Sequence, residues 1–178
     1  MNSIFFDLSF VDQVNSAVMS FVAKHGDAFH EVTKILLVNF LVPLEKFLVG
    51  LHPMAVLVVI TALAWHALRR WGMVLALVAG LYLIGCFGLW DKLMQTLALM
   101  MVATTLTLVI GMPMGIWMST SPRLRRVLEP VLDVMQTLPT FVYLIPVLML
   151  FGLGKVPAVL ATVIYALPPL VRLTDLGI

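Results

Sequence analysis

Charge is scarce in this chain: only 11% of its 178 residues are Asp, Glu, Lys or Arg, against 62% hydrophobic residues. The mean hydropathy is +1.08. A soluble protein of this length has too little interior to hide so much apolar surface. The scarcity of charge therefore excludes a soluble class and indicates an integral membrane protein. The net charge of +2 is also too small to suggest binding to nucleic acid.

Cysteine and catalytic motifs are missing as well. Cys86 is the one cysteine, which excludes an internal disulfide and a cysteine metal cluster. It lies inside an apolar run, where we expect a buried and inert thiol. The four histidines have no metal-like spacing, and no phosphate-binding glycine loop, paired carboxylates within an apolar run or activated nucleophile is present. We therefore expect no catalytic, cofactor or metal site, and no enzymatic activity, in this chain.

Long apolar runs make up most of the chain after its first 46 residues. A membrane-spanning helix needs about 20 apolar residues, and five runs reach or approach that length. They predict an all-α, polytopic membrane protein with about five transmembrane helices, at Phe47–Leu68, Trp71–Trp90, Leu97–Met118, Val134–Gly154 and Val156–Val171. Before them, Phe10–Val22 and His30–Leu44 place apolar residues at helical spacing among polar ones. This spacing predicts amphipathic helices that do not span.

Basic residues between the runs predict the orientation of the chain. The first and third loops hold five arginines, whereas the second and fourth loops hold one lysine each. Because cytoplasmic loops carry an excess of positive charge, the first and third loops are expected in the cytoplasm. Residues 1–46 then form an external amphipathic region, and the C-terminal end is cytoplasmic. The arginines that give this signal, some of which could also contact lipid or a partner, are Arg69, Arg70, Arg123, Arg125 and Arg126.

Prolines interrupt the last two runs. Pro139 and Pro146 fall in the fourth run, and Pro168 and Pro169 fall in the fifth. A proline inside a soluble helix costs roughly 3 kcal/mol. In a bilayer, neighbouring helices, hydroxyl groups or water can satisfy the freed backbone groups. We interpret these prolines as hinge or path-lining positions, with ordinary kinked packing as the alternative.

Aromatic and small residues supply further candidates. Phe141, Tyr143 and Tyr165 could line a path for a quaternary ammonium cation, which is attracted to aromatic faces, although lipid or helix packing would explain them too. Gly111 and Gly115 form a small-xxx-small pair around Pro113. Such a pair predicts the close approach of a neighbouring helix.

Three strings in the second half of the chain resemble a known family. They read GMPMGIWMSTSPRLRRVLEP, PVLDVMQTLPTFVYLIPVLMLFGLG and IYALPPLVRLTDLGI. They resemble the permease subunit of bacterial ABC importers for glycine betaine, proline betaine and related quaternary amines such as choline. The similarity is nearly continuous from about Leu93 to Ile178, while the part before it is similar only in plan. We therefore divide the chain into residues 1–46, a two-span leader at 47–91, and the N-terminal part of a type I importer permease domain at 92–178.

This resemblance implies a subunit of an inner-membrane importer of osmoprotectants that works by alternating access. Two permease copies would form the path, two cytoplasmic ATPase subunits would bind the ATP, and an external binding protein would deliver the solute. The prolines and aromatic residues named above would line the path or act as hinges. Nothing in the sequence names the solute.

The family carries a coupling motif, the EAA helix that docks in the ATPase, in the loop after the fifth span. The sequence ends at Ile178, where that loop would begin. We therefore expect a truncated gene product or a fragment that cannot couple ATP hydrolysis by itself. Two alternatives remain open: a non-transporting scaffold or regulatory stump that pairs with a full-length permease, and an ion-coupled transporter. The latter would need ionisable groups within its spans, and none lies between Val134 and Gly154.

Overall fold

The computed structural model describes residues 16, 20, 31 and 34–178, and this part of the chain is helical without any strand. The all-α prediction is confirmed. The amphipathic helix predicted at Phe10–Val22 lies outside the described residues. The elements are the π-helical turn η1 (Leu37–Leu41), α2 (Val42–Val49), α3 (Pro53–Leu68), α4 (Trp71–Cys86), α5 (Trp90–Thr120), α6 (Pro122–Thr137), α7 (Thr140–Phe151) and α8 (Lys155–Leu176).

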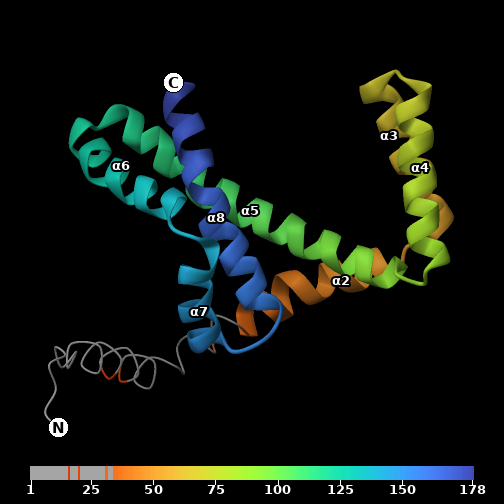
Figure 1. Cartoon of the computed structure of the whole chain (residues 1–178), viewed down its shortest axis with the longest axis horizontal. Helices are drawn as coiled ribbons and strands as arrows, with labels where there is room; N and C mark the ends of the chain where they lie inside the picture. The colour runs from red at the N-terminus through yellow and green to blue at the C-terminus, as the bar shows by residue number, and fades with distance from the viewer. Residues whose placement is uncertain (1–15, 17–19, 21–30, 32–33) are drawn as a thin grey trace, which may run out of the picture.

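The long helix α5 is the element to which the others attach. It slants across the molecule, with α8 packed against it, α2 alongside its first half, and α6 folded back at its far end (Figure 1). One core joins the first half of α5 to η1, α2 and α8 through residues such as Leu41, Met94 and Val159. A smaller core at the other end of α5 joins Met118, Leu132 of α6 and Val171 of α8.

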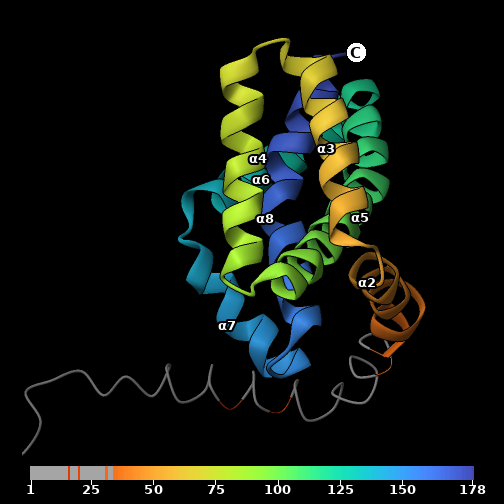
Figure 2. The ribbon, with the colours of Figure 1, turned by 90° about the vertical axis from the view of Figure 1, so that its right-hand side faces the viewer.

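Helices α3 and α4 form a hairpin that stands away from this body. The two helices run side by side in both views (Figure 2), and a ring contact of 4.0 Å between Trp65 and Trp71 closes the hairpin. The turn between them is only two residues long, and Arg69 adopts a left-handed conformation there, with φ of 48°. Most side chains of the hairpin are exposed, which suits contact with lipid or with other helices.

Two of the predicted spans agree well with the helices. Helices α5 and α8 are each long and apolar enough to cross a membrane, which confirms the third and fifth predicted spans in outline. Pro157 lies in the first turn of α8, where its missing N–H costs no helical hydrogen bond. The second predicted span ends earlier than expected, because α4 stops at Cys86 and Trp90 already begins α5.

The first and fourth predicted spans are wrong as continuous helices. Each is divided between two helices bent by 97° and 95°, respectively, so that Phe47 belongs to α2 and Val134 to α6. In both cases the break stands before a proline: His52 precedes Pro53 and Leu138 precedes Pro139, and both preceding residues are extended. Steric clash with the proline ring disfavours helical geometry in the residue before it.

The amphipathic segment predicted at His30–Leu44 begins among residues that the structure does not describe, and its end differs from the prediction. From Lys34 onward the described helix continues past Leu44 to Val49, and Pro43 stands in the first turn of α2 instead of at the helix end. By length and apolarity, the described helices hold two membrane spans, or four if each bent pair counts as one. The prediction of a polytopic membrane protein is confirmed, while α4, at 16 residues, is a shorter apolar helix.

Candidate functional site

Helices α5 and α8 share the most extensive contact between any two described helices. The buried face of α5 carries small residues at four-residue intervals, Ala103, Thr107, Gly111 and Gly115. A Cβ atom at Gly115 would stand 2.8 Å from the Val171 carbonyl oxygen. The sequence-predicted glycine pair therefore lies where α8 approaches α5, and Gly115 is the one of the two that leaves room for the backbone of α8.

A small cavity of about 210 Å³ opens between the same two helices. Its lining includes Thr104 and Thr107 of α5 and Thr162 of α8, with Ala103, Leu108, Ala166 and Leu170. The hydroxyl of Thr107 donates to the Ala103 carbonyl, and that of Thr162 donates to the Ala158 carbonyl. Each hydroxyl oxygen keeps lone pairs that can face a cation or accept a further bond. These threonines were missed in the sequence, although the run TTLT inside an apolar helix was a visible signal.

The prolines of α8 stand in different surroundings. Pro168 is fully buried, whereas its neighbour Pro169 is exposed. Helix α8 continues through both prolines, so the carbonyls of Ile164 and Tyr165 have no helical N–H donor. Tyr165 is 64% exposed and lies near Pro169 on the helix surface. We name this exposed stripe, made of Ala158, Tyr165, Pro169 and Leu173, the open face of α8.

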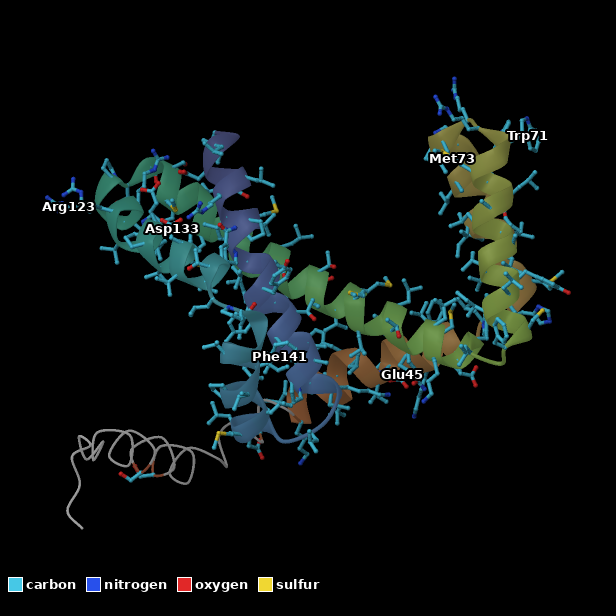
Figure 3. All side chains as sticks on the ribbon, viewed as in Figure 1. Glu45, Trp71, Met73, Arg123, Asp133 and Phe141 are labelled. Atoms are coloured by element: carbon cyan, nitrogen blue, oxygen red, sulfur yellow. The ribbon has the colours of Figure 1, made fainter. Side chains whose placement is uncertain are left out.

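Helix α7 carries the remaining predicted residues and packs beside α8. Pro139 precedes its first turn as the N-cap residue and is not a kink within a span. Of the two prolines in the fourth predicted run, only Pro146 therefore lies inside α7. Phe141 is 70% exposed and lies in the first turn of α7 (Figure 3). The Tyr143 hydroxyl is buried without a hydrogen-bond partner in the described part of the chain.

Two ion pairs connect α6 to the last turns of α8. Arg172 donates to the Asp133 carboxylate, and Arg125 donates to the Asp175 carboxylate. The hydrogen bond to Asp175, and secondly its charge, raise the pKa of the Arg125 guanidinium above its usual value. Both pairs are partly exposed, so they fix position more than they add stability. The arginines predicted as topology signals thus include one, Arg125, that also holds two helices together.

A third ion pair lies at the opposite end of α8. The Lys155 ammonium group contacts both carboxylate oxygens of Glu45 in α2 at 2.6 Å. The Glu45 side chain is only 16% exposed, so this pair is better shielded from water than a typical surface pair. Sequence reasoning assigned Lys155 only to a short turn, because nothing local links it to a residue 110 positions away.

The turns separate into two groups in space. The α3–α4 turn, the α5–α6 turn and the C-terminus lie toward one side, and the α4–α5 and α7–α8 turns lie toward the other (Figure 1). Arg123 stands at the far edge of the first group (Figure 3). All five arginines predicted to mark one side of the membrane come from the α3–α4 turn or from α6 just after the α5–α6 turn.

The described residues offer no place for a metal ion. They include no group of three or more His, Cys, Asp or Glu side chains able to ligate one. Cys86 is exposed at the end of α4, so the expectation of a buried thiol is wrong. Among the described helices, α4 packs mainly against α3, and this leaves the Cys86 side chain uncovered.

Comparison with known proteins points to one family. Residues 107–178 match the model of the binding-protein-dependent transport system inner membrane component. The chain is 46% identical over 134 residues, 75% of its length and 38% of the relative, to the glycine betaine/proline betaine transport system permease protein ProW of Escherichia coli (strain K12). It is 45% identical over 130 residues, 72% of its length and 46% of the relative, to the glycine betaine transport system permease protein OpuAB of Bacillus subtilis (strain 168).

The name of a third relative includes carnitine in addition to glycine betaine. The glycine betaine/carnitine transport permease protein GbuB of Listeria monocytogenes serotype 1/2a (strain 10403S) is 49% identical over 110 residues, 62% of the chain and 39% of the relative. Across these three relatives the match covers less than half of the relative's own length.

Proposed function

Residues 107–178 belong to the family of binding-protein-dependent transport system inner membrane components, and from this premise we propose that the chain forms part of the membrane path of an ATP-driven importer. Its solute would be glycine betaine, proline betaine or a related quaternary amine such as choline. The observation that carries the proposal is the identity of 46% over 134 residues to a glycine betaine/proline betaine permease protein. As an inner-membrane component with apolar helices, the chain is a multi-pass membrane protein.

The partners follow from the same premise. A cytoplasmic ATPase subunit hydrolyses ATP, an external solute-binding protein delivers the quaternary amine, and a second permease copy completes the path. The chain itself binds no ATP and catalyses no reaction. The arginine-bearing turns and the C-terminal end face the cytoplasm, and residues 1–46 face outside, in keeping with the excess of positive charge on cytoplasmic loops.

The open face of α8 is the part of the chain that we assign to the path. It combines an exposed aromatic ring, Tyr165, with an exposed proline, Pro169, on a helix long enough to cross the bilayer. A quaternary ammonium group offers no N–H donor, so aromatic faces and oxygen lone pairs are the groups that attract it. Phe141 and the threonines of the α5–α8 cavity supply more of both kinds.

The prolines of α8 suggest how the path moves. The C-terminal half of α8 is held against Gly111 and Gly115, and the N-terminal half is packed through Val159 and Val163. Between these contacts, two carbonyls lack a helical donor because of Pro168 and Pro169. Bending at this point would move the two halves separately, as alternating access requires. Selectivity would remain mostly with the binding protein, since the path needs only weak contacts.

The test is uptake of labelled glycine betaine and choline by cells that lack other betaine importers and express this chain, joined to the C-terminal part of a related permease that carries the coupling loop, with the ATPase and binding-protein genes. Uptake should stop on ATP depletion and persist when an ionophore collapses the ion gradients. The reverse pattern would indicate an ion-coupled transporter. No uptake, with the chain and both partners present in the membrane fraction, would favour a scaffold and reject the proposed transport.

A further inference from the structure

Helix α6 has an apolar face that no described residue covers. The face consists of side chains spaced one helical turn apart, Val127, Val131, Val134 and, just beyond the helix, Leu138, which are between 40% and 65% exposed. Valines at this spacing point in one direction from the helix. In a helix with five charged residues, such a stripe gives the strong amphipathic character typical of helices that lie in a membrane surface.

The other faces of α6 are already occupied. Leu132 is 1% exposed and packs with Met118 and Val171 in the core between α5, α6 and α8. Asp133 and Arg125 form the ion pairs to Arg172 and Asp175. The helix is therefore held to the body on two sides, and the valine stripe remains outside as a fixed surface.

The bend between α6 and α7 indicates how the valine stripe is oriented relative to the membrane. The two helices meet at 95° around Leu138 and Pro139. If α7 follows the membrane normal, as its wholly uncharged sequence suggests, α6 lies along the plane of the bilayer. Its charges then fall at the level of the lipid head groups.

Positive charge without a partner flanks the valine stripe. Arg123 and Arg126 are exposed, and neither forms an ion pair within the described part of the chain. Arg123 points away from the rest of the molecule (Figure 3). Beside Arg126, a hollow of about 240 Å³ is lined by Met118, Ser119, Pro122, Arg125, Arg126 and Glu129. Since Arg125 is already paired with Asp175, Arg126 is the cation left to face this hollow.

We propose that α6 is an anionic-lipid-binding helix, with its valine stripe in the boundary between head groups and acyl chains and with Arg123 and Arg126 on lipid phosphates. The occupant is a lipid surface because the exposed groups form an apolar stripe with cations at its edge, which is the pattern that an anionic bilayer complements. This inference requires the chain to be in a membrane but does not depend on the transported solute, so it can fail or succeed independently of the proposed function.

The experiment uses the full chain in a Cys86→Ala background, with an environment-sensitive fluorophore on Val131→Cys, in vesicles of phosphatidylcholine with or without phosphatidylglycerol. The fluorophore should report an apolar site at shallow depth, and brominated phosphatidylglycerol should quench it more than brominated phosphatidylcholine. Arg123→Gln with Arg126→Gln should lower the preference for phosphatidylglycerol roughly ten- to thirtyfold. Arg123→Lys with Arg126→Lys should retain it, and high salt should weaken it only where the positive charges remain.

The matched control is Arg69→Gln with Arg70→Gln, which removes the same charge from the α3–α4 turn and should leave quenching at Val131 unchanged. Circular dichroism of each variant verifies that the helices are intact. A fluorophore that reports water in both kinds of vesicle would overturn the proposal. Equal quenching by both lipids would also overturn it. A change in fluorescence seen only when the ATPase subunit or a second copy of the chain is added would overturn it too, because it would show that the stripe is a protein interface.

Discussion

Gly115 is the residue at which the packing of α5 and α8 is least tolerant of change. A Cβ atom there would stand 2.5 Å from the Thr174 Cβ and 2.8 Å from the Val171 carbonyl oxygen, and the latter belongs to backbone. Gly115→Ala should therefore destabilise the protein by about 1–3 kcal/mol, the usual cost of overpacking. Thermal unfolding in detergent, followed by intrinsic tryptophan fluorescence, measures the effect.

Two other glycines serve as graded controls for this prediction. At Gly111, the added atom would meet the flexible end of Leu170, so Gly111→Ala should cost less than Gly115→Ala. At Gly80 in α4, nothing lies within 4 Å of the added atom, so alanine should be neutral or stabilise by about 0.5–1 kcal/mol. Equal effects at all three positions would show that α8 does not approach α5 as closely as described.

At the residue scale, the sequence predicted what depends on local spacing and missed what depends on distant contacts. The GMPMG string predicted close packing, because two glycines four residues apart share one helix face. The ion pairs of Glu45 with Lys155 and of Asp133 with Arg172 were missed, since their members lie 110 and 39 positions apart. The cavity threonines were missed for the same reason, as Thr162 comes from another helix than Thr107.

At the scale of the element, α8 carries the prediction about hinge motion. Pro169 is exposed, so Pro169→Ala should restore a hydrogen bond to the Tyr165 carbonyl without loss of buried contacts. The change should stabilise α8 by about 1–3 kcal/mol, because an interior proline costs about that much. If α8 bends during transport, the same variant should lower the rate of betaine uptake by the assembled importer. Thermal unfolding and uptake are measured on the same preparation.

Pro168 provides the comparison within the same helix. It is fully buried, so Pro168→Ala would also restore a hydrogen bond but would remove buried ring atoms and leave a cavity. The Pro168→Ala variant should therefore gain less stability than Pro169→Ala, or gain none. A Pro169→Ala variant that is more stable and transports at the normal rate would reject the hinge and leave ordinary helix packing as the explanation.

The helix breaks show why element boundaries were harder to predict than element identity. Counting uncharged residues predicted one span from Val134 to Gly154, yet the chain turns by 95° within that run. Leu138 and Pro139 mark the break, but a count of uncharged residues does not detect it, since leucine and proline carry no charge. In α8, by contrast, two adjacent prolines did not end the helix, because packing against α5 and α6 holds both halves in place.

At the scale of the whole molecule, the spatial grouping of the turns predicts a labelling pattern. In a Cys86→Ala background, cysteines at Leu89 and Leu153 should react with a membrane-impermeant maleimide applied from outside. Cysteines at Arg70 and Ser121 should react only after the membrane is permeabilised. The reason is that these two pairs of turns lie on opposite sides of the molecule (Figure 1), and the proposed orientation puts the arginine-bearing side in the cytoplasm. Labelling of Arg70→Cys and Leu153→Cys from the same side would contradict this arrangement.

The shape of the whole molecule is what the sequence alone did not supply. The runs of apolar residues predicted a multi-pass helical protein, and the resemblance predicted the permease family, but neither predicted that α3 and α4 stand apart from α5. Both the open face of α8 and the region of the hairpin carry exposed aromatic side chains, such as Tyr165 at 64% and Phe87, just after α4, at 74%. Surfaces of this kind suit contact with lipid, a second copy or an aqueous path.

The most direct test of the transport path is the water accessibility of the open face of α8 in the assembled importer. Tyr165→Cys, in the Cys86→Ala background, should react with a water-soluble thiol reagent at a rate that changes when ATP and the loaded binding protein are added. Val163→Cys, buried against α5, and Val58→Cys, 67% exposed on α3, should stay unreactive, since one faces the core and the other lipid. If Tyr165→Cys is as unreactive as Val58→Cys in every state, the open face of α8 contacts lipid and does not line a path.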